Sequence, residues 1–116
     1  MKLSLLVSLL MATSAVVWAQ QVMPRMISVD PMNGKEGDVI AVTGENLEKA
    51  TVAKVYLTDE KIDLPVEVTE QTATSIKFKI PAKVQPGSRL TVMVLTTGKD
   101  AKLIEQPVKL QIDEQH

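Results

Sequence analysis

The feature that most constrains the fold of this chain is a set of short segments in which apolar and polar residues alternate. The clearest of them runs from Ser75 to Ile80, where Ile76, Phe78 and Ile80 are separated by lysines. Similar segments recur between groups of Pro, Gly, Asn and Asp residues, and no stretch beyond residue 25 has the spacing of an amphipathic helix. Alternation with a period of two is typical of strands that bury one face. The pattern therefore predicts an all-β, antiparallel sandwich.

Seven strands are expected, over residues 26–29, 39–43, 53–57, 62–68, 75–80, 90–95 and 108–112. An immunoglobulin-like sandwich has this strand count in about 100 residues, so this is the expected architecture. Pro65 has no N–H group, which places its strand at a sheet edge or in a bulge. Leu47 ends the bend that follows the strand at 39–43 and is expected to close one end of the sandwich. The side chains expected to face the core are Ile27, Val29, Ile40, Val42, Val55, Leu57, Leu64, Val66, Val68, Ile76, Phe78, Ile80, Leu90, Val92, Val94, Val108, Leu110 and Ile112.

Residues 1–19 have the layout of a secretory signal peptide. Lys2 supplies the positive start, an apolar stretch follows, and Val17-Trp18-Ala19 forms a cleavage site before Gln20. The alternative is an uncleaved anchor, but a membrane span needs about 20 apolar residues, and Ser and Thr residues interrupt this shorter run. We therefore expect cleavage, export to the periplasm or the cell exterior, and no membrane span after cleavage. The expected organisation is a signal peptide over 1–19, a lead-in over 20–25, one domain over 26–112 and a polar tail over 113–116.

The domain region resembles the IPT/TIG domain. The resemblance rests on Ile27–Pro31, on Gly34 and Gly37, and on the run Ile40–Leu47, which ends in the sequence Gly-Glu-Asn-Leu. The segment Ile76–Pro81 also fits, and the match spans roughly residues 24–112. The resemblance implies an immunoglobulin-like sandwich that works mainly as an interaction or spacer module, in receptors, in transcription factors and in bacterial exported proteins. The DNA-contacting members rely on basic loops, which this chain lacks.

Composition excludes several classes of chemistry. The chain has no cysteine and a net charge of −1, which excludes disulfide scaffolds and Cys nucleophiles and leaves no basic patch for nucleic acid. The only histidine, His116, is the last residue, where it is not held rigidly enough for a catalytic triad. Asp59, Glu60 and Asp63 are the densest acid cluster, but their spacing matches no calcium loop and predicts a polar turn. We expect no enzymatic activity, no cofactor and no bound metal.

The expected function is a secreted or periplasmic, non-catalytic interaction module. Its protein partner would bind at loops or at an exposed strand edge, and the candidate edges are residues 62–68 and 108–112. Tyr56 faces outward on the strand at 53–57 and is the candidate contact residue. The alternative is a carbohydrate-binding accessory protein at the cell surface. Against it, Tyr56 and Phe78 are the only aromatic residues beyond the signal, and Phe78 is expected to face inward.

Two further groups of residues have ordinary structural explanations. Met23, Met26 and Met32 could form an adaptable apolar patch, but closing the end of the core is the favoured interpretation. Lys77 and Lys79 point outward and could bind an anion. A solvated face that discourages association between sheets is the favoured interpretation.

Overall fold

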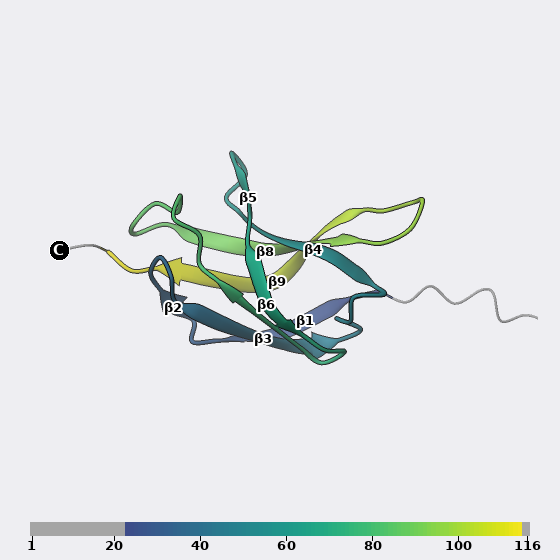
Figure 1. Cartoon of the computed structure of the whole chain (residues 1–116). Coiled ribbons are helices and arrows are strands. Elements are labelled where there is room, and N and C mark those ends of the chain that lie inside the picture. The colour runs from purple at the N-terminus through teal and green to yellow at the C-terminus, as the bar shows by residue number, and fades with distance from the viewer. Residues whose placement is uncertain (1–22, 115–116) are drawn as a thin grey trace, which may run out of the picture.

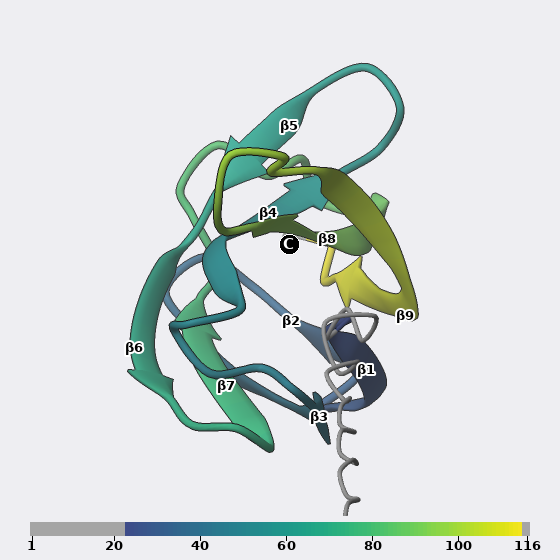
Figure 2. The same cartoon turned by 90° about the vertical axis from the view of Figure 1, so that its right-hand side faces the viewer.

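Two β-sheets pack face to face and enclose the core (Figures 1 and 2). The computed structural model describes residues 23–114, and this part of the chain is built from strands and turns. It has no helix long and apolar enough to cross a membrane. The predicted signal peptide over 1–19, residues 20–22 of the lead-in and residues 115–116 of the tail, which include His116, lie outside the described residues.

Within residues 23–114, nine strands make up the two sheets, against the seven expected. The four-stranded sheet has the order β1 (Arg25–Asp30), β3 (Val39–Glu45), β7 (Ser75–Lys79), β6 (Glu67–Gln71). The five-stranded sheet has the order β2 (Asn33–Gly34), β9 (Leu103–Ile112), β8 (Arg89–Thr96), β4 (Val52–Thr58), β5 (Asp63–Pro65). Every pairing is antiparallel except that of β2 with β9, which is parallel. The predicted all-β, immunoglobulin-like sandwich is confirmed.

The core lies between the sheets and is made by alternate residues of the long strands. Ile40 and Val42 on β3 and Ile76 and Phe78 on β7 are fully buried, as their alternation predicts. Register places Ile40 beside Phe78 and Val42 beside Ile76, so these cross-strand pairs form one continuous apolar layer. The opposing layer comes from the five-stranded sheet, through buried residues that include Val55, Leu57, Leu90, Val92, Val94, Val108, Leu110 and Ile112.

One core prediction is wrong on β1. Ile27 was expected to face inward, but its side chain is 58% exposed, whereas Met26 is fully buried. The register shifts between Met26, which lies opposite Gly44, and Ser28, which lies opposite Thr43. Ile27 is therefore the extra residue of a β-bulge, and a bulge reverses which neighbour points into the core.

The segment predicted as one strand over 62–68 is two strands in different sheets. β5 pairs with β4 in the five-stranded sheet, whereas β6 pairs with β7 in the four-stranded sheet. The chain changes sheets at Val66, whose N–H still donates to the Val55 carbonyl over 3.1 Å. Because the segment crosses the open side of the sandwich, Leu64, Val66 and Val68 are only partly buried.

The Gly-Glu-Asn-Leu segment has a separate structural reason at each of three positions. A Cβ on Gly44 would lie 2.1 Å from the Arg25 carbonyl oxygen, so β1 passes too close for any side chain. Asn46 has a φ of 57° and its amide donates to the Met23 carbonyl over 3.1 Å, which suits a residue tolerant of the left-handed region. Leu47 is fully buried and closes the end of the core as predicted.

Candidate functional site

At β1, β2 and β5 the sheet edges offer few free main-chain groups for a partner strand, and β6 is the remaining edge strand. On β1 the Met26 N–H points away from β3 and donates to Oε1 of the buried Gln106 over 2.7 Å. This bond links the edge of one sheet to β9 of the other. The predicted edge over 108–112 is corrected, because β2 lies beyond β9 and pairs with Gln111 and Ile112. These contacts close this side of the sandwich.

The strand that contains Pro65 lies at a sheet edge, as the sequence predicts, but the proline makes this edge a poor site for adding a partner strand. β5 is the outer strand of its sheet. Ile62 accepts a hydrogen bond from Asp59 and Val66 donates one to Val55, and hydrogen-bonded pairs alternate along an antiparallel ladder. The backbone nitrogen of Pro65, one residue before Val66, therefore points to the outer edge of the sheet. Because this nitrogen carries no hydrogen, it offers a partner strand no donor. Proline at such a position discourages strand addition.

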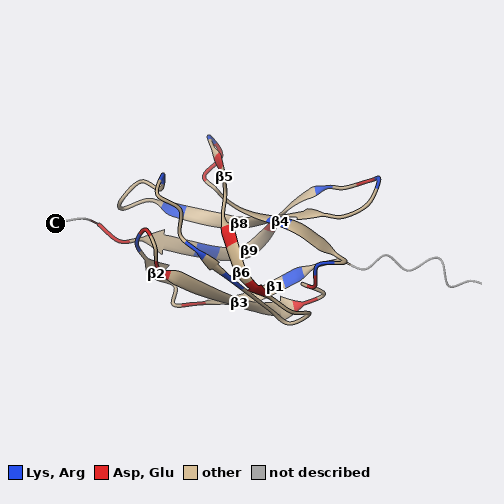
Figure 3. Ribbon diagram, in the orientation of Figure 1, with Lys and Arg blue, Asp and Glu red and all other residues tan. Residues whose placement is uncertain are grey.

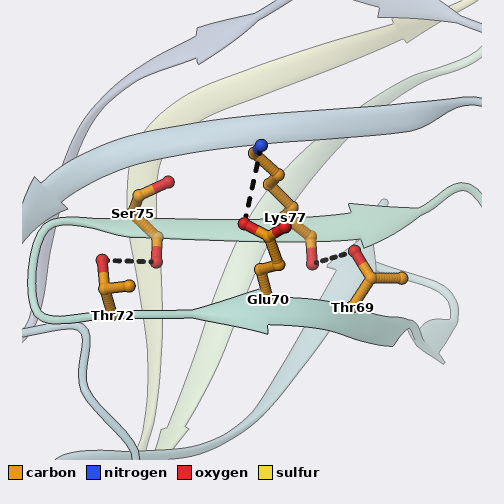
Figure 4. A network of polar contacts seen from close by, with 5 residues as sticks. All are labelled: Thr69, Glu70, Thr72, Ser75 and Lys77. Carbon is orange, nitrogen blue, oxygen red and sulfur yellow. Dashed lines mark hydrogen bonds and ion pairs between the residues drawn. The ribbon is translucent and has the colours of Figure 1, made fainter.

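The β6–β7 part of the outer face of the four-stranded sheet is charged and internally paired, whereas β3 exposes Val39 on the same face. On β6 and β7, Glu70 lies opposite Lys77 and Glu67 lies opposite Lys79. Figure 3 shows where acidic and basic residues lie along the ribbons of the sandwich. Nζ of Lys77 and Oε1 of Glu70 are 3.5 Å apart, and this is the one ion pair within residues 23–114. The Thr69 hydroxyl donates to the Lys77 carbonyl in the same network (Figure 4). Lys77 is thus engaged by an acid of its own sheet.

The outer face of the five-stranded sheet is different, because it gathers apolar side chains around Tyr56. One cross-strand row runs from Pro65 through Tyr56 to Met93 and ends at Glu105. The next row runs from Lys54 through Leu95 to Leu103. Met93 is buried, Tyr56 and Leu95 are half-buried, and Pro65 and Leu103 are exposed. We call the five apolar members, Tyr56, Pro65, Met93, Leu95 and Leu103, the Tyr56 face.

Two hairpins project beyond the body of the sandwich (Figure 1). The β4–β5 hairpin contains the predicted acid cluster. Asp59 Oδ1 accepts hydrogen bonds from the N–H groups of Lys61 at 2.9 Å and Ile62 at 3.1 Å, and these bonds hold the pKa of Asp59 below its ordinary value of 3.8. The Thr58 hydroxyl donates to Asp63 over 2.7 Å. The acids therefore order the turn, and the described residues contain no group of three side chains placed to hold a metal ion.

The β8–β9 hairpin borders a groove of about 860 Å³ that has a mixed polar lining. Thr96, Lys99 and Lys102 contribute from the hairpin, and Glu48 and Met23 contribute from the opposite side. Oε1 of Glu48 is buried and has no hydrogen-bond partner within the described chain. Among residues 23–114 the groove has no aromatic lining residue, so this part of the chain gives it no stacking platform of the kind expected for a sugar site.

The three methionines form no common patch, and of the three only Met26 packs in the core, where all three were expected to close its end. Met26 is fully buried in the core, whereas Met23 and Met32 are exposed. Met23 precedes β1 and Met32 follows it, so the two exposed methionines lie beyond opposite ends of one strand. Tyr56 faces outward as predicted, but its apolar neighbours Met93 and Leu95 were not identified from sequence. Two features together place Met93 and Leu95 beside Tyr56 on this face. They are the alternation of side chains along β8 and the register of β4, β8 and β9.

The IPT/TIG domain model matches residues 24–112 of the chain. No curated protein matches the sequence. Several solved structures share the fold, among them a structural genomics protein of unknown function from Bacteroides thetaiotaomicron, with a TM-score of 0.65 and 22% identity. An auxiliary nutrient binding protein from Bacteroides ovatus has a TM-score of 0.55 and 22% identity, and a putative phosphatase from B. thetaiotaomicron has 0.56 and 17%.

The shared region is most of this chain but a small part of the others. It covers 79%, 80% and 79% of this chain, and 22%, 21% and 18% of the three structures, respectively. In each of those proteins the sandwich is thus one portion of a longer chain. At these identities the likeness establishes the fold.

Proposed function

Since the chain belongs to the IPT/TIG domain family, we propose that it is an exported, non-catalytic module that binds a protein partner through the Tyr56 face. Membership of the family supports a binding module. The observation that carries the choice of surface is the contrast between the two outer faces. On β6 and β7 one face has charges that pair with one another, as Glu70 and Lys77 do, whereas the other face exposes Pro65 next to the half-buried Tyr56, and Leu103 two strands away.

A face is favoured over the edges at β1, β2 and β5 because the donors there are used or missing, and the remaining edge strand, β6, carries Glu67 and Glu70, charges that discourage strand addition. A partner strand would need a row of unpaired N–H and C=O groups. The Met26 donor is already used by Gln106, Pro65 has none to offer, and β2 is only two residues long. Apolar side chains on a rigid sheet supply contact area at a low cost in conformational entropy, so the Tyr56 face is the better surface.

Carbohydrate binding is the second candidate, and the Bacteroides ovatus relative described as a nutrient binding protein favours it. Tyr56 is the one aromatic side chain on the outer face, and it is half-buried between Pro65 and Met93 in the register. A single half-buried ring presents little area for stacking on a sugar. We therefore place protein binding ahead of carbohydrate binding.

The export part of the proposal rests on residues 1–19 of the sequence. Removal of this segment would leave Gln20 as the first residue. Intact-mass measurement of the protein recovered from the cell envelope tests it directly. A mass that corresponds to residues 20–116 supports cleavage, whereas a full-length mass in the membrane fraction would show an uncleaved anchor.

Affinity capture from the native envelope tests the binding proposal. Leu103→Lys places a charge on the Tyr56 face, and Val39→Lys is a matched control because Val39 is similarly exposed, 47% against 53%, on the outer face of the other sheet. We expect Leu103→Lys to abolish capture of a specific protein and Val39→Lys to retain it. Equal capture by both variants would refute the choice of face. If instead the protein is retained on a polysaccharide matrix and Tyr56→Ala abolishes this retention, carbohydrate binding would be favoured.

A further inference from the structure

The charges that flank the Tyr56 face are arranged diagonally. Lys54 lies at the β4 end of the row that contains Leu95 and Leu103. Glu105 lies at the β9 end of the neighbouring row, beyond Tyr56 and Met93. A base and an acid therefore stand at opposite corners of one apolar surface.

Neither charge is satisfied by its own sheet. Both side chains are exposed, and the ion pair within residues 23–114 is the one between Lys77 and Glu70. Two strand spacings and one two-residue step separate Lys54 from Glu105, which is about 12 Å. This distance is too long for an ion pair within one chain, so each charge is available to a partner.

We propose that the Tyr56 face binds a second copy of this chain in a two-fold symmetric, face-to-face dimer. In a two-fold symmetric interface every contact occurs twice. If residue i of one copy contacts residue j of the other, then residue j of the first copy contacts residue i of the second. Turning one copy over onto the other about a two-fold axis between the corners brings Lys54 of each chain opposite Glu105 of the other. The apolar residues between the corners then meet one another. The inference rests on the proposed function, since it names the partner for the same face.

The surface of the molecule limits the assembly to a dimer. A face-to-face pair covers the Tyr56 face of both copies, so no Tyr56 face remains for a third copy to bind. The blunted edges at Pro65 and at the Met26–Gln106 bond oppose extension by strand pairing. The exposed part of the face consists mainly of Leu103 and Pro65, so the dimer is expected to be weak and concentration-dependent.

Sedimentation equilibrium of the purified protein from about 1 µM to about 1 mM tests the proposal, a range that brackets weak association. We expect monomer at the low end and dimer at the high end. Lys54→Glu and Glu105→Lys should each weaken association at least about tenfold, because each brings like charges together. The double reversal should restore association to within about threefold of the unmodified protein. Val39→Lys should leave the dissociation constant unchanged.

Three results would overturn the dimer. The first is a protein that stays monomeric at about 1 mM. The second is association that Leu103→Lys does not reduce, and the third is a double reversal that is no better than either single change. A monomer whose envelope capture is still lost in Leu103→Lys refutes the second copy but leaves the proposed binding face standing. A monomer with no face-dependent capture refutes both.

Discussion

Replacing Gly44 with alanine tests how closely β1 packs on β3. The added Cβ would lie 2.1 Å from the Arg25 carbonyl oxygen, 2.8 Å from Met26 Cα and 3.0 Å from the Arg25 carbonyl carbon. All three atoms belong to the backbone, so no side-chain rotation relieves the overlap. The φ of Gly44 lies outside the left-handed region, so the expected cost is steric. The start of β1 must therefore move away from β3.

The size of the effect follows from what that movement exposes. Met26 is fully buried, and its burial contributes about 1.5–3 kcal/mol. Its N–H bond to Gln106 contributes about 1 kcal/mol. Alanine offsets about 0.4–1 kcal/mol of this loss by restricting the unfolded chain. We expect the free energy of unfolding to fall by about 2–4 kcal/mol, which corresponds to a fall in Tm of roughly 10–30 °C for a domain of this size.

Urea and thermal unfolding followed by far-UV circular dichroism measure this change. Gly98→Ala is the control, since a Cβ there meets nothing within 4 Å and the φ is +95°. Its expected cost is the conformational penalty alone, about 1 kcal/mol. A Gly44→Ala protein within about 0.5 kcal/mol of the unmodified protein, the range of neutral surface changes, would refute the close packing of β1 on β3.

Three other perturbations address the sandwich edges and the β4–β5 turn. Gln106→Ala leaves the Met26 N–H unpaired and should lower the free energy of unfolding by about 1–3 kcal/mol. Hydrogen exchange at the Met26 amide should also become faster, and an unchanged exchange rate would contradict the hydrogen bond. The pKa of Asp59 is lower in the folded protein than its ordinary value of 3.8. The ionised carboxylate therefore contributes to the free energy of unfolding above pH 3.8, and this contribution is lost as the pH falls through the folded-state pKa. The stability difference between the native protein and Asp59→Asn, measured by urea unfolding from neutral to acidic pH, should therefore shrink on acidification, and a constant difference would count against the turn bonds. Pro65→Val restores an edge donor and should produce species larger than a dimer in light scattering; an unchanged distribution would show that the proline does not protect this edge.

The interior of the sandwich could be predicted from local pattern alone. Ile40, Val42, Ile76 and Phe78 alternate without interruption, and all four are fully buried. Their strands are central in the four-stranded sheet and continue without a bulge where they pair with each other. Local alternation and the tertiary environment agree in these two strands, so the alternation alone predicts which side chains are buried.

The predictions failed where a strand departs from regular pairing. At Ile27 an extra residue reverses the inward face, and at Val66 the chain leaves one sheet for the other. β2 is too short for any alternation to show, and its pairing with Ile112 depends on residues far apart in the sequence. These features arise from contacts between distant segments, which a local pattern does not encode.

The candidate site illustrates the same division. The outward direction of Tyr56 follows from its place between Val55 and Leu57, but its neighbours depend on how β4, β8 and β9 align. Alternation by itself determined the fold class and most of the core, because successive side chains of any strand point to opposite faces whatever the strand pairs with. Only the tertiary structure decided the bulges, the blunted edges and the grouping of Tyr56 with Met93 and Leu103. Those depend on strand register, which is set by long-range packing and hydrogen bonds rather than by neighbouring residues.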